Sequence, residues 1–176
     1  MPRRAVFLDR DGVLNRSLII NGKPFAPRCL EDFVIFDDVD KALEKLKSKG
    51  FYLIVATNQP DVGNGFVSQI VVEAMHSILR AKLPIDDIEV CYASQNDGSF
   101  RRKPEPGMLL DAASKWEIEL STSFMIGDRA GDIEAGRRAG CRTVFLDRGY
   151  EEKKPLSPDY IATSLGSATE IIARIA

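Results

Sequence analysis

Two aspartates one residue apart follow the first apolar segment of the chain. Residues 5–15 read Ala-Val-Phe-Leu-Asp-Arg-Asp-Gly-Val-Leu-Asn, so Asp9 and Asp11 come where a strand ends and Gly12 follows directly. Glycine gives the backbone the freedom to turn at that point. One carboxylate that attacks and one that moves a proton are the groups that covalent phosphoryl transfer needs. Taken alone, the motif is equally compatible with a polar loop after an edge strand.

The segments that must position these carboxylates follow two alternating patterns. Short apolar runs predict strands, and segments with apolar residues every three or four positions predict helices. The expected strands cover residues 4–9, 51–56, 88–93, 123–126, 142–146 and 160–162, and the expected helices 38–49, 67–81, 106–116, 133–139 and 167–175. This alternation predicts an α/β fold, a doubly wound and mainly parallel sheet, in a single domain over residues 1–176.

The first expected helix has clear end signals. Val39, Leu43 and Leu46 lie on one face at helical spacing. Asp38 is the expected N-cap, and Gly50 is expected to end the helix.

Polar motifs fall after the carboxyl ends of four predicted strands. Asp9 and Asp11 follow the first strand, Thr57-Asn58-Gln59 the second, Lys103 the third and the segment 127–132 the fourth. Open α/β sheets bind ligands beyond these strand ends, where separate segments converge. The sequence therefore predicts one site built from all four groups.

The composition excludes several other classes of protein. The chain has 176 residues, 44% of them hydrophobic, and a net charge of −2. There is no basic footprint for nucleic acid and no apolar run long enough to span a bilayer. The start of the chain lacks the pattern of a secretory signal, so we expect a cytoplasmic protein without nucleic-acid or membrane partners, as a monomer or small homo-oligomer.

Cysteine and histidine chemistry is not expected to carry the function. Cys29, Cys91 and Cys141 are scattered and odd in number, which argues against a disulfide framework. His76 is the only histidine and lies in a predicted helix without a second ligand at metal-binding spacing. Hydrolases that use a serine or cysteine with a histidine base are therefore disfavoured, and His76 is expected at a helix surface or in packing.

The four motifs together resemble those of the haloacid dehalogenase (HAD) superfamily of phosphotransferases. The matching phrases are Asp9-Arg-Asp-Gly12, Thr57, Lys103 and Gly127-Asp128-x-x-x-Asp132. Longer phrases, including residues 7–15, 57–59, 102–108 and 132–136, are similar to the branch of histidinol phosphatases and D-glycero-D-manno-heptose 1,7-bisphosphate phosphatases. The match covers nearly the whole chain in the right order.

The resemblance implies a role for each motif. Asp9 would attack phosphorus and form an aspartyl phosphate, and Asp11 would act as general acid and then as base. Mg²⁺ would bind to the side chains of Asp9 and Asp128 and to the backbone carbonyl of Asp11. Lys103 would neutralise charge on the phosphate.

Further contacts are expected around these groups. Thr57 and Asn58, with neighbouring backbone N–H groups, would bind phosphate oxygens. Asp132 is either a partner of the metal site or of Lys103, or a carboxylate favoured by the helix dipole.

The chain also departs from its relatives in two loops. Relatives often carry a zinc loop, Cys-x-His followed by Cys-x-Cys, of which only Cys91 remains here, so no zinc is expected. Asn64 stands where relatives often have a basic residue.

The segment after the first strand is too short for a large cap, so the site should be open. Candidate substrate contacts are Asn15, Arg28, Asn58 and Arg102.

The expected function is Mg²⁺-dependent hydrolysis of a small phosphate monoester, a heptose bisphosphate or related sugar phosphate. Histidinol phosphate is the alternative within the same chemistry. A nucleic-acid 3′-phosphatase would need a basic patch with interleaved aromatic residues, which the sequence lacks. A non-catalytic protein that binds a phosphorylated ligand is the alternative from a different class.

Overall fold

The computed structural model describes residues 2–176, which form an α/β fold around one six-stranded parallel sheet. The sheet has the order β5-β4-β1-β6-β7-β8, and a separate antiparallel pair consists of β2 and β3. The strands are β1 Arg4–Leu8, β2 Leu18–Ile20, β3 Lys23–Phe25, β4 Phe51–Asn58, β5 Asp87–Cys91, β6 Phe124–Gly127, β7 Arg142–Leu146 and β8 Tyr160–Ala162. The helices are α1 Val39–Ser48, α2 Pro60–Gly63, α3 Gln69–Lys82, α4 Gly107–Trp116, α5 Ala130–Ala139 and α6 Leu165–Ile175, with a 3₁₀ turn at Leu120–Thr122.

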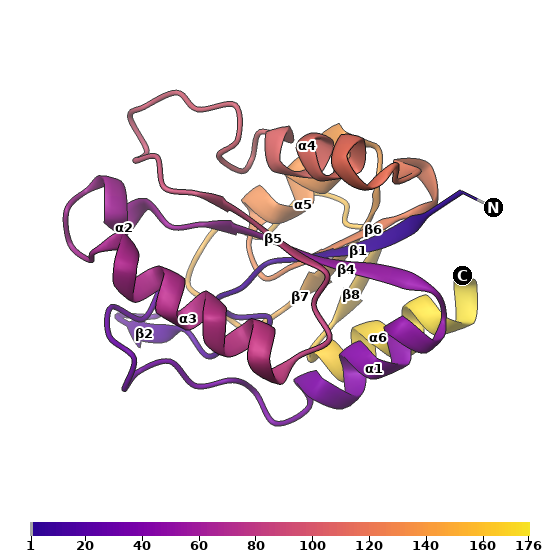
Figure 1. Ribbon diagram of the computed structural model, residues 1–176, viewed down its shortest axis with the longest axis horizontal. Coiled ribbons are helices and arrows are strands. Elements are labelled where there is room, and N and C mark those ends of the chain that lie inside the picture. The colour runs from indigo at the N-terminus through magenta and orange to yellow at the C-terminus, as the bar shows by residue number, and fades with distance from the viewer. Residues whose placement is uncertain (1) are drawn as a thin grey trace.

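Helices cover both faces of the sheet (Figure 1). On one face, α1, α3 and α6 pack around a core that includes Leu43, Met75 and Ile172. On the other face, α4 and α5 enclose a second core that includes Phe7 and Met108. The central strands are therefore apolar on both sides, which explains why β1 reads as a continuous hydrophobic run instead of an alternating one.

The strand order reverses at β1. The chain proceeds from β1 outward to β4 and β5, then returns to β6 on the other side of β1 and continues to β7 and β8. The carboxyl ends of β1, β4, β5 and β6 all lie at the edge of the sheet where α2 and the β2–β3 hairpin are found (Figure 1). This is the ligand-binding edge of a doubly wound sheet.

Most predicted elements are confirmed, with shifts at their ends. β7 and β8 have the expected bounds, and the other strands differ by one or two residues at either end. β4 is longer than expected, so Thr57 and Asn58 end the strand instead of beginning a loop. α5 begins at Ala130, before the expected start, because the Asp132 carboxylate accepts the Arg129 N–H at 3.0 Å and so caps the helix there.

The predicted cap of the first helix is wrong in one respect. Gly50 follows the helix with φ +81° and donates its N–H to the Lys47 carbonyl, as expected for a helix end. Asp38, however, makes no side-chain capping bond to α1. Its carboxylate instead accepts the N–H of Gly166 in α6 at 3.1 Å, so it joins two helices that are distant in the sequence.

The β2–β3 hairpin was not predicted from the sequence. Asn21 and Gly22 both have positive φ, 50° and 73°, which is the conformation of the two central residues in a type I′ turn. An Asn-Gly pair between apolar residues is the strongest local hairpin signal, and it was available in the sequence. The turn is attached to a distant loop, because the Glu151 N–H donates to the Gly22 carbonyl at 2.9 Å.

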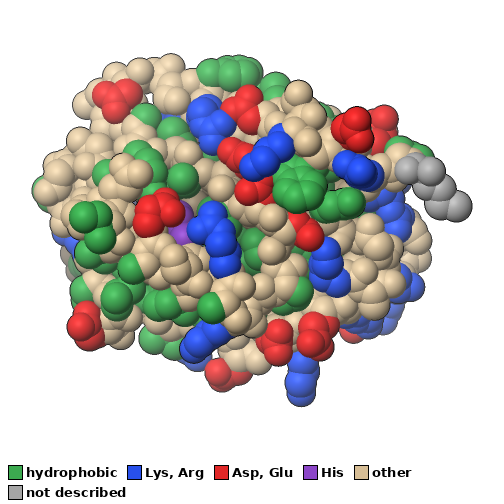
Figure 2. Space-filling model, viewed as in Figure 1, with side chains coloured by type: hydrophobic (Ala, Val, Ile, Leu, Met, Phe, Trp, Pro, Cys, Tyr) green, Lys and Arg blue, Asp and Glu red, His purple; other side chains and the backbone are tan. Residues whose placement is uncertain are grey.

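Over residues 2–176 we find no helix with the length and apolar character to cross a membrane. On the face shown in Figure 2, Lys and Arg side chains are interspersed with Asp and Glu side chains. That face therefore presents no extended patch of one charge.

A pair of glycine substitutions tests the packing of α5 against the sheet. A Cβ at Gly136 would lie 2.5 Å from the Met125 Cβ, whereas a Cβ at Gly166 in α6 would meet nothing closer than 3.4 Å. Gly136→Ala is therefore expected to lower the free energy of unfolding by about 1–3 kcal/mol through overpacking. Gly166→Ala is expected to leave it unchanged or raise it by up to about 1 kcal/mol, since alanine favours helix. Urea titrations of both variants measure this, and equal effects would contradict the close approach of α5.

Candidate active site

Three buried carboxylates meet at the carboxyl edge of the sheet. Asp9 follows β1, Asp128 follows β6, and Asp132 lies in the first turn of α5. One carboxylate oxygen of each lies within 4.8 Å of those of the other two. All three residues are at least nine-tenths buried. So much buried negative charge is unfavourable without nearby cations.

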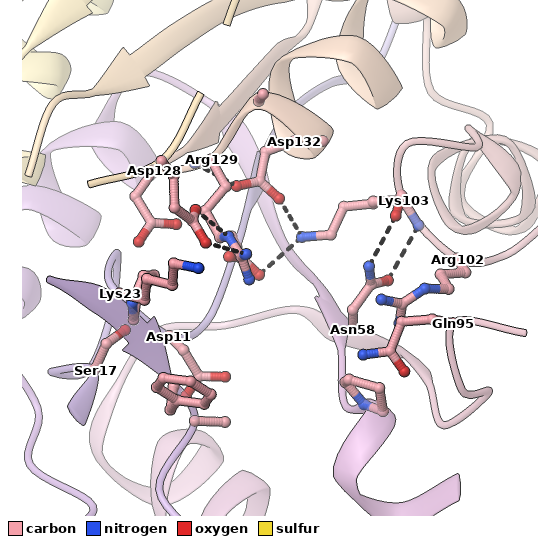
Figure 3. Close-up of a pocket in the computed structure, with 18 of the residues that line it drawn as sticks. Asp11, Ser17, Lys23, Asn58, Gln95, Arg102, Lys103, Asp128, Arg129 and Asp132 are labelled. Atoms are coloured by element: carbon pink, nitrogen blue, oxygen red, sulfur yellow. Dashed lines mark hydrogen bonds and ion pairs between the residues drawn. The ribbon is translucent and has the colours of Figure 1, made fainter. Parts of the chain in front are cut away.

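Lys103 is the cation that the structure provides (Figure 3). Its Nζ lies 2.8 Å from Asp9 Oδ1 and 2.6 Å from Asp132 Oδ1. Burial on its own would lower the pKa of Lys103, but the charges of Asp132 and Asp9 outweigh it and raise that pKa above its usual value. Lys103 is therefore held as a cation between two acids.

One lysine does not balance three carboxylates. Burial, followed by the charge of Asp132, raises the pKa of Asp9 from 3.8 to about 6. Burial and the charges of Asp9 and Asp132 also raise the pKa of Asp128 well above its usual value. The cluster retains an excess of negative charge that a divalent cation would neutralise.

Asp128 has one oxygen fixed and one oxygen free. The Tyr150 hydroxyl donates a hydrogen bond to Asp128 Oδ2 at 2.7 Å. Asp128 Oδ1 is buried, and no hydrogen-bond partner for it is found among the described residues. Gly12 makes room for this arrangement, because a Cβ there would lie 1.8 Å from Asp128 Oδ2.

These residues fit a Mg²⁺ ion. Magnesium prefers oxygen ligands and is usually bound by one or two carboxylates together with substrate phosphate. Asp9 and Asp128 supply carboxylates, and Asp128 Oδ1 is a buried acceptor without a partner among residues 2–176. The expected third ligand, the Asp11 backbone carbonyl, stays a prediction.

Asp132 has one carboxylate oxygen on the lysine and the other at the start of its own helix. Its Oδ1 lies 2.6 Å from Lys103 Nζ, and its Oδ2 accepts the Arg129 N–H at 3.0 Å. Gly127 allows the helix to approach this closely, since a Cβ there would lie 2.1 Å from the Asp132 Cβ. Asp132 therefore links the start of α5 to the lysine.

Asn58 holds the backbone of Lys103. Its Nδ2 donates to the Lys103 carbonyl at 3.0 Å, and its Oδ1 accepts the Lys103 N–H at 3.1 Å. This pair of hydrogen bonds joins the end of β4 to the loop before α4 (Figure 3). The Asn58 side chain thus positions Lys103, while its expected contact with phosphate stays a prediction.

Thr57 is fully buried at the end of β4. Its Oγ1 accepts a hydrogen bond from Gln59 Nε2 at 2.9 Å, which leaves the hydroxyl proton available to another acceptor. The same Gln59 nitrogen lies 2.8 Å from Asp11 Oδ2. Gln59 therefore connects the end of β4 with the second aspartate.

Asp11 is surrounded by donors. Arg10 Nη2 lies 2.9 Å from its Oδ1 and 3.1 Å from its Oδ2, and Asn15 Nδ2 lies 2.9 Å from Oδ1. Burial would raise the pKa of Asp11, but the Arg10 charge and the hydrogen bonds from Asn15, Arg10 and Gln59 together lower it. Without substrate, Asp11 is therefore ionised, which suits a base. An anion bound beside it would add negative charge and shift its pKa upward.

The carboxylates form part of the wall of a cavity of about 830 Å³. Asp9, Asp11, Asp128 and Asp132 line it together with Lys103. The hairpin closes one side through Lys23, Pro24, Phe25 and Ala26, and further wall residues are Arg102, Arg129, Gln95 and Lys153. The site is an open cleft of the size that small-molecule sites usually have, with a short hairpin instead of a cap domain.

The predicted substrate contacts lie at different places relative to the cavity. Arg102 lines the cavity and is half-buried. Asn15 is fully buried and donates to Asp11, so it supports that carboxylate instead of facing the cavity, because the turn after β1 folds it inward. Arg28 is not among the lining residues, and its Nε pairs with Asp61 Oδ2 at 2.7 Å at the rim.

Ion pairs, a thiol contact and a backbone hydrogen bond hold the loop between β5 and α4. Arg101 pairs with Glu89 at 2.7 Å and also with Asp111. The Cys91 thiol lies 3.8 Å from Ser99 Oγ, and the Gly107 N–H donates to the Phe100 carbonyl at 3.0 Å. Arg101 thus joins the loop to both β5 and α4.

Several residues of the site were not predicted. Arg10 lies between the two aspartates of the first motif, but the sequence assigned it no role, and Tyr150 and Lys23 come from segments without a recognised motif. The Asn-Gly turn could have drawn attention to Lys23. Nothing local identifies Tyr150, because its contact with Asp128 depends on how a loop 22 residues further along the chain folds back.

Comparisons with known proteins agree with this geometry. Residues 100–168 match the HAD-hydrolase-like family. The chain is 33% identical, over 98% of its length and 96% of the relative's, to the D-glycero-D-manno-heptose-1,7-bisphosphate 7-phosphatase of Thermosynechococcus vestitus. It is 35% identical, over 83% of its length and 80% of the relative's, to the D-glycero-alpha-D-manno-heptose-1,7-bisphosphate 7-phosphatase of Burkholderia mallei.

A solved structure has the same fold. The D,D-heptose 1,7-bisphosphate phosphatase from B. bronchiseptica, complexed with magnesium and phosphate, superposes with a TM-score of 0.84 at 23% identity, covering 98% of this chain and 99% of that one. The fold, the motifs and the sequence identity over nearly the whole length therefore agree. The chain belongs to the HAD-like phosphatases, in the family of the heptose-1,7-bisphosphate 7-phosphatases.

Proposed function

We propose that the protein is a Mg²⁺-dependent phosphatase that removes a phosphate group from a heptose 1,7-bisphosphate. The observation that carries this proposal is the cluster of Asp9, Asp128 and Asp132 with Lys103, buried beneath an open cavity. The names of the relatives at 33% and 35% identity give the substrate class. Relatives acting on either anomer match, so the proposal does not assign one.

In this proposal, Asp9 is the nucleophile. Its carboxylate lines the cavity and attacks phosphorus, so that a bond to Asp9 forms while the bond from phosphorus to the sugar oxygen breaks. Lys103 holds one Asp9 oxygen at 2.8 Å and so orients the carboxylate. Asp9 and Asp128 would hold the Mg²⁺ ion, whose positive charge would allow an anionic carboxylate to approach an anionic phosphate.

Asp11 moves the protons. It gives a proton to the departing sugar alkoxide and then takes one from the water that attacks the aspartyl phosphate. That attack releases inorganic phosphate and restores the Asp9 carboxylate. Thr57, whose hydroxyl proton is available, would donate to a phosphate oxygen.

Arg102 is the proposed contact for the second phosphate. It is half-buried on the cavity wall, and its Nη1 contacts only a carbonyl, that of Ala93 at 3.4 Å. Across the part of the chain that the structure describes, no carboxylate pairs with it, in contrast to Arg129, which pairs with Glu152 at 2.6 Å. An unpaired guanidinium beside the site suits an anionic group of the substrate. No zinc belongs to this proposal, since Cys91 alone cannot form a tetrahedral site.

Replacing the nucleophile is the first test. Asp9→Asn is expected to reduce phosphate release from heptose 1,7-bisphosphate by on the order of 10⁴-fold or more, because an amide cannot form the phosphoenzyme. Asp40→Asn, an exposed carboxylate in the first turn of α1, serves as the matched control and should keep full activity. Normal turnover by Asp9→Asn would exclude the assigned nucleophile.

The same assay separates the alternatives. A higher kcat/KM for histidinol phosphate than for heptose bisphosphate would assign the other substrate of this family branch. Binding of phosphate esters without any turnover of them, measured by calorimetry, would favour a non-catalytic binding protein.

Metal binding is tested through Tyr150. Tyr150→Phe removes the hydrogen bond that orients Asp128. Loss of a residue that hydrogen-bonds to a metal ligand typically weakens metal binding by about 10–100-fold. We therefore expect calorimetry to show an increase of that size in the Kd of Mg²⁺. Tyr160→Phe in β8, a partly buried tyrosine distant in sequence from the cluster, is the control. An unchanged Kd in Tyr150→Phe would argue against Asp128 as a ligand.

The pH dependence of stability offers a further test without substrate. The pKa of Asp9, raised from 3.8 to about 6, means that the folded protein without metal prefers the protonated form. Its contribution to stability is complete below pH 3.8 and is lost as the pH rises through about 6. His76, whose pKa burial and the Arg10 charge lower to about 4, acts in the opposite direction. The difference between wild type and Asp9→Asn removes the contribution of His76, which is present in both, and reports on Asp9 together with Asp128, whose pKa the Asp9 charge also raises.

In the presence of a chelator, we expect the unfolding free energy of wild type, relative to that of Asp9→Asn, to rise by on the order of 1 kcal/mol as the pH falls from about 7 to about 5. Saturating Mg²⁺ should abolish this rise, because a bound cation favours the ionised carboxylate. Urea titrations at each pH provide the measurement. A difference that stays constant with chelator would show that Asp9 is not destabilised by burial.

A further inference from the structure

Arg10 is a fully buried arginine between the two aspartates of the first motif. Its side chain has no exposed surface, and its Nε and Nη2 both donate to Asp11, at 3.1 Å and 2.9 Å from Oδ1. The guanidinium also lies over the Phe33 ring, 5.5 Å from its centre. A buried guanidinium has five N–H donors to satisfy, so the groups around it decide where it points.

His76 is the group that faces Arg10 from the neighbouring helix α3. It is fully buried, and its Nε2 lies 3.2 Å from Arg10 Nη1. A guanidinium can only donate hydrogen bonds, so Nε2 must accept, and the imidazole proton must be on Nδ1. Nδ1 in turn lies 3.3 Å from Glu73 Oε1, which also accepts the Tyr92 hydroxyl.

The surroundings of His76 require a neutral ring. Arg10 and Arg80 place positive charge near it, Glu73 places negative charge near it, and burial, the largest effect, lowers its pKa to about 4. A neutral imidazole with its proton on Nδ1 therefore accepts from Arg10 on one side and donates to Glu73 on the other. The chain of contacts runs from Glu73 through His76 and Arg10 to Asp11.

We propose that His76 is a positioning residue for the acid–base aspartate, acting through Arg10. The inference rests on the proposed role of Asp11 in proton transfer. Arg10 holds Asp11 from one side, and Asn15 and Gln59 hold it from the others at 2.9 Å and 2.8 Å. Without an acceptor at position 76, Arg10 Nη1 would lose its buried partner and the guanidinium would turn toward another one. The Asp11 carboxyl would then lose the orientation that proton transfer requires.

Nuclear magnetic resonance tests the tautomer directly. His76 is the only histidine, so the imidazole ¹⁵N signals of the labelled protein belong to it alone. We expect a neutral ring protonated on Nδ1 at neutral pH. A ring protonated on Nε2, or a charged imidazolium, would overturn the proposal, whether or not the protein proves to be a phosphatase.

Kinetics test the consequence for Asp11. An alkoxide leaving group needs a proton, whereas the phenolate of p-nitrophenyl phosphate departs readily without one. His76→Leu should therefore reduce kcat/KM more for heptose 1,7-bisphosphate than for p-nitrophenyl phosphate. We expect the two reductions to differ by a factor of roughly ten, which is part of the roughly 10²–10⁴-fold that proton transfer contributes. His76→Gln keeps an acceptor for Arg10 and should restore most of the selectivity. Met75→Leu, a buried neighbour in α3, should leave the ratio of the two values unchanged.

The design separates the possible failures. Equal losses on both substrates, or no loss, would refute the positioning role while the proposed function stands. A wild-type protein inactive on both esters would refute the proposed function, and the tautomer measurement would remain valid. If His76→Leu does not fold, Glu73→Met replaces it, because Glu73 is partly exposed and its loss removes the acceptor of Nδ1. Glu73→Gln, which retains an amide acceptor, is its matched control.

Discussion

The site depends on the burial of more negative charge than the protein neutralises. Asp9, Asp128 and Asp132 are brought together at the carboxyl ends of β1 and β6, and Lys103 contacts only two of them. This imbalance raises the pKa of Asp9 and of Asp128 in the absence of a cation. In the proposed function, a divalent ion and an anionic ester would complete a set of charges that the folded chain leaves incomplete.

The parallel sheet makes this concentration of charge possible. Strands that run in one direction deliver their carboxyl ends to one edge, where the chain leaves the sheet and its side chains become free to meet. The lysine arrives from a different strand, and its backbone is fixed by Asn58 at the end of β4. Two adjacent strand ends and one loop therefore set the distance between Lys103 and Asp9.

Around the cluster, the aspartates are oriented by separate groups of donors. Tyr150 fixes Asp128 from the segment after β7, while Arg10, Asn15 and Gln59 fix Asp11. The hairpin forms one side of the cavity and is attached through Gly22 to Glu151, close to Tyr150 in the chain. The loop that holds the hairpin in place therefore also holds Asp128, through the neighbouring residues Glu151 and Tyr150.

The sequence by itself determined the order of strands and helices, the parallel sheet and the positions of Asp9, Asp11, Lys103 and Asp128 at its carboxyl edge. These features depend on local apolar periodicity and on motifs at strand ends, and both can be read within a short window. The tertiary structure decided which side chains face the cavity and which support it. Asn15 turned inward, Asp38 joined α6 instead of capping its own helix, and Tyr150 reached Asp128, because each of these outcomes depends on contacts between segments far apart in the chain.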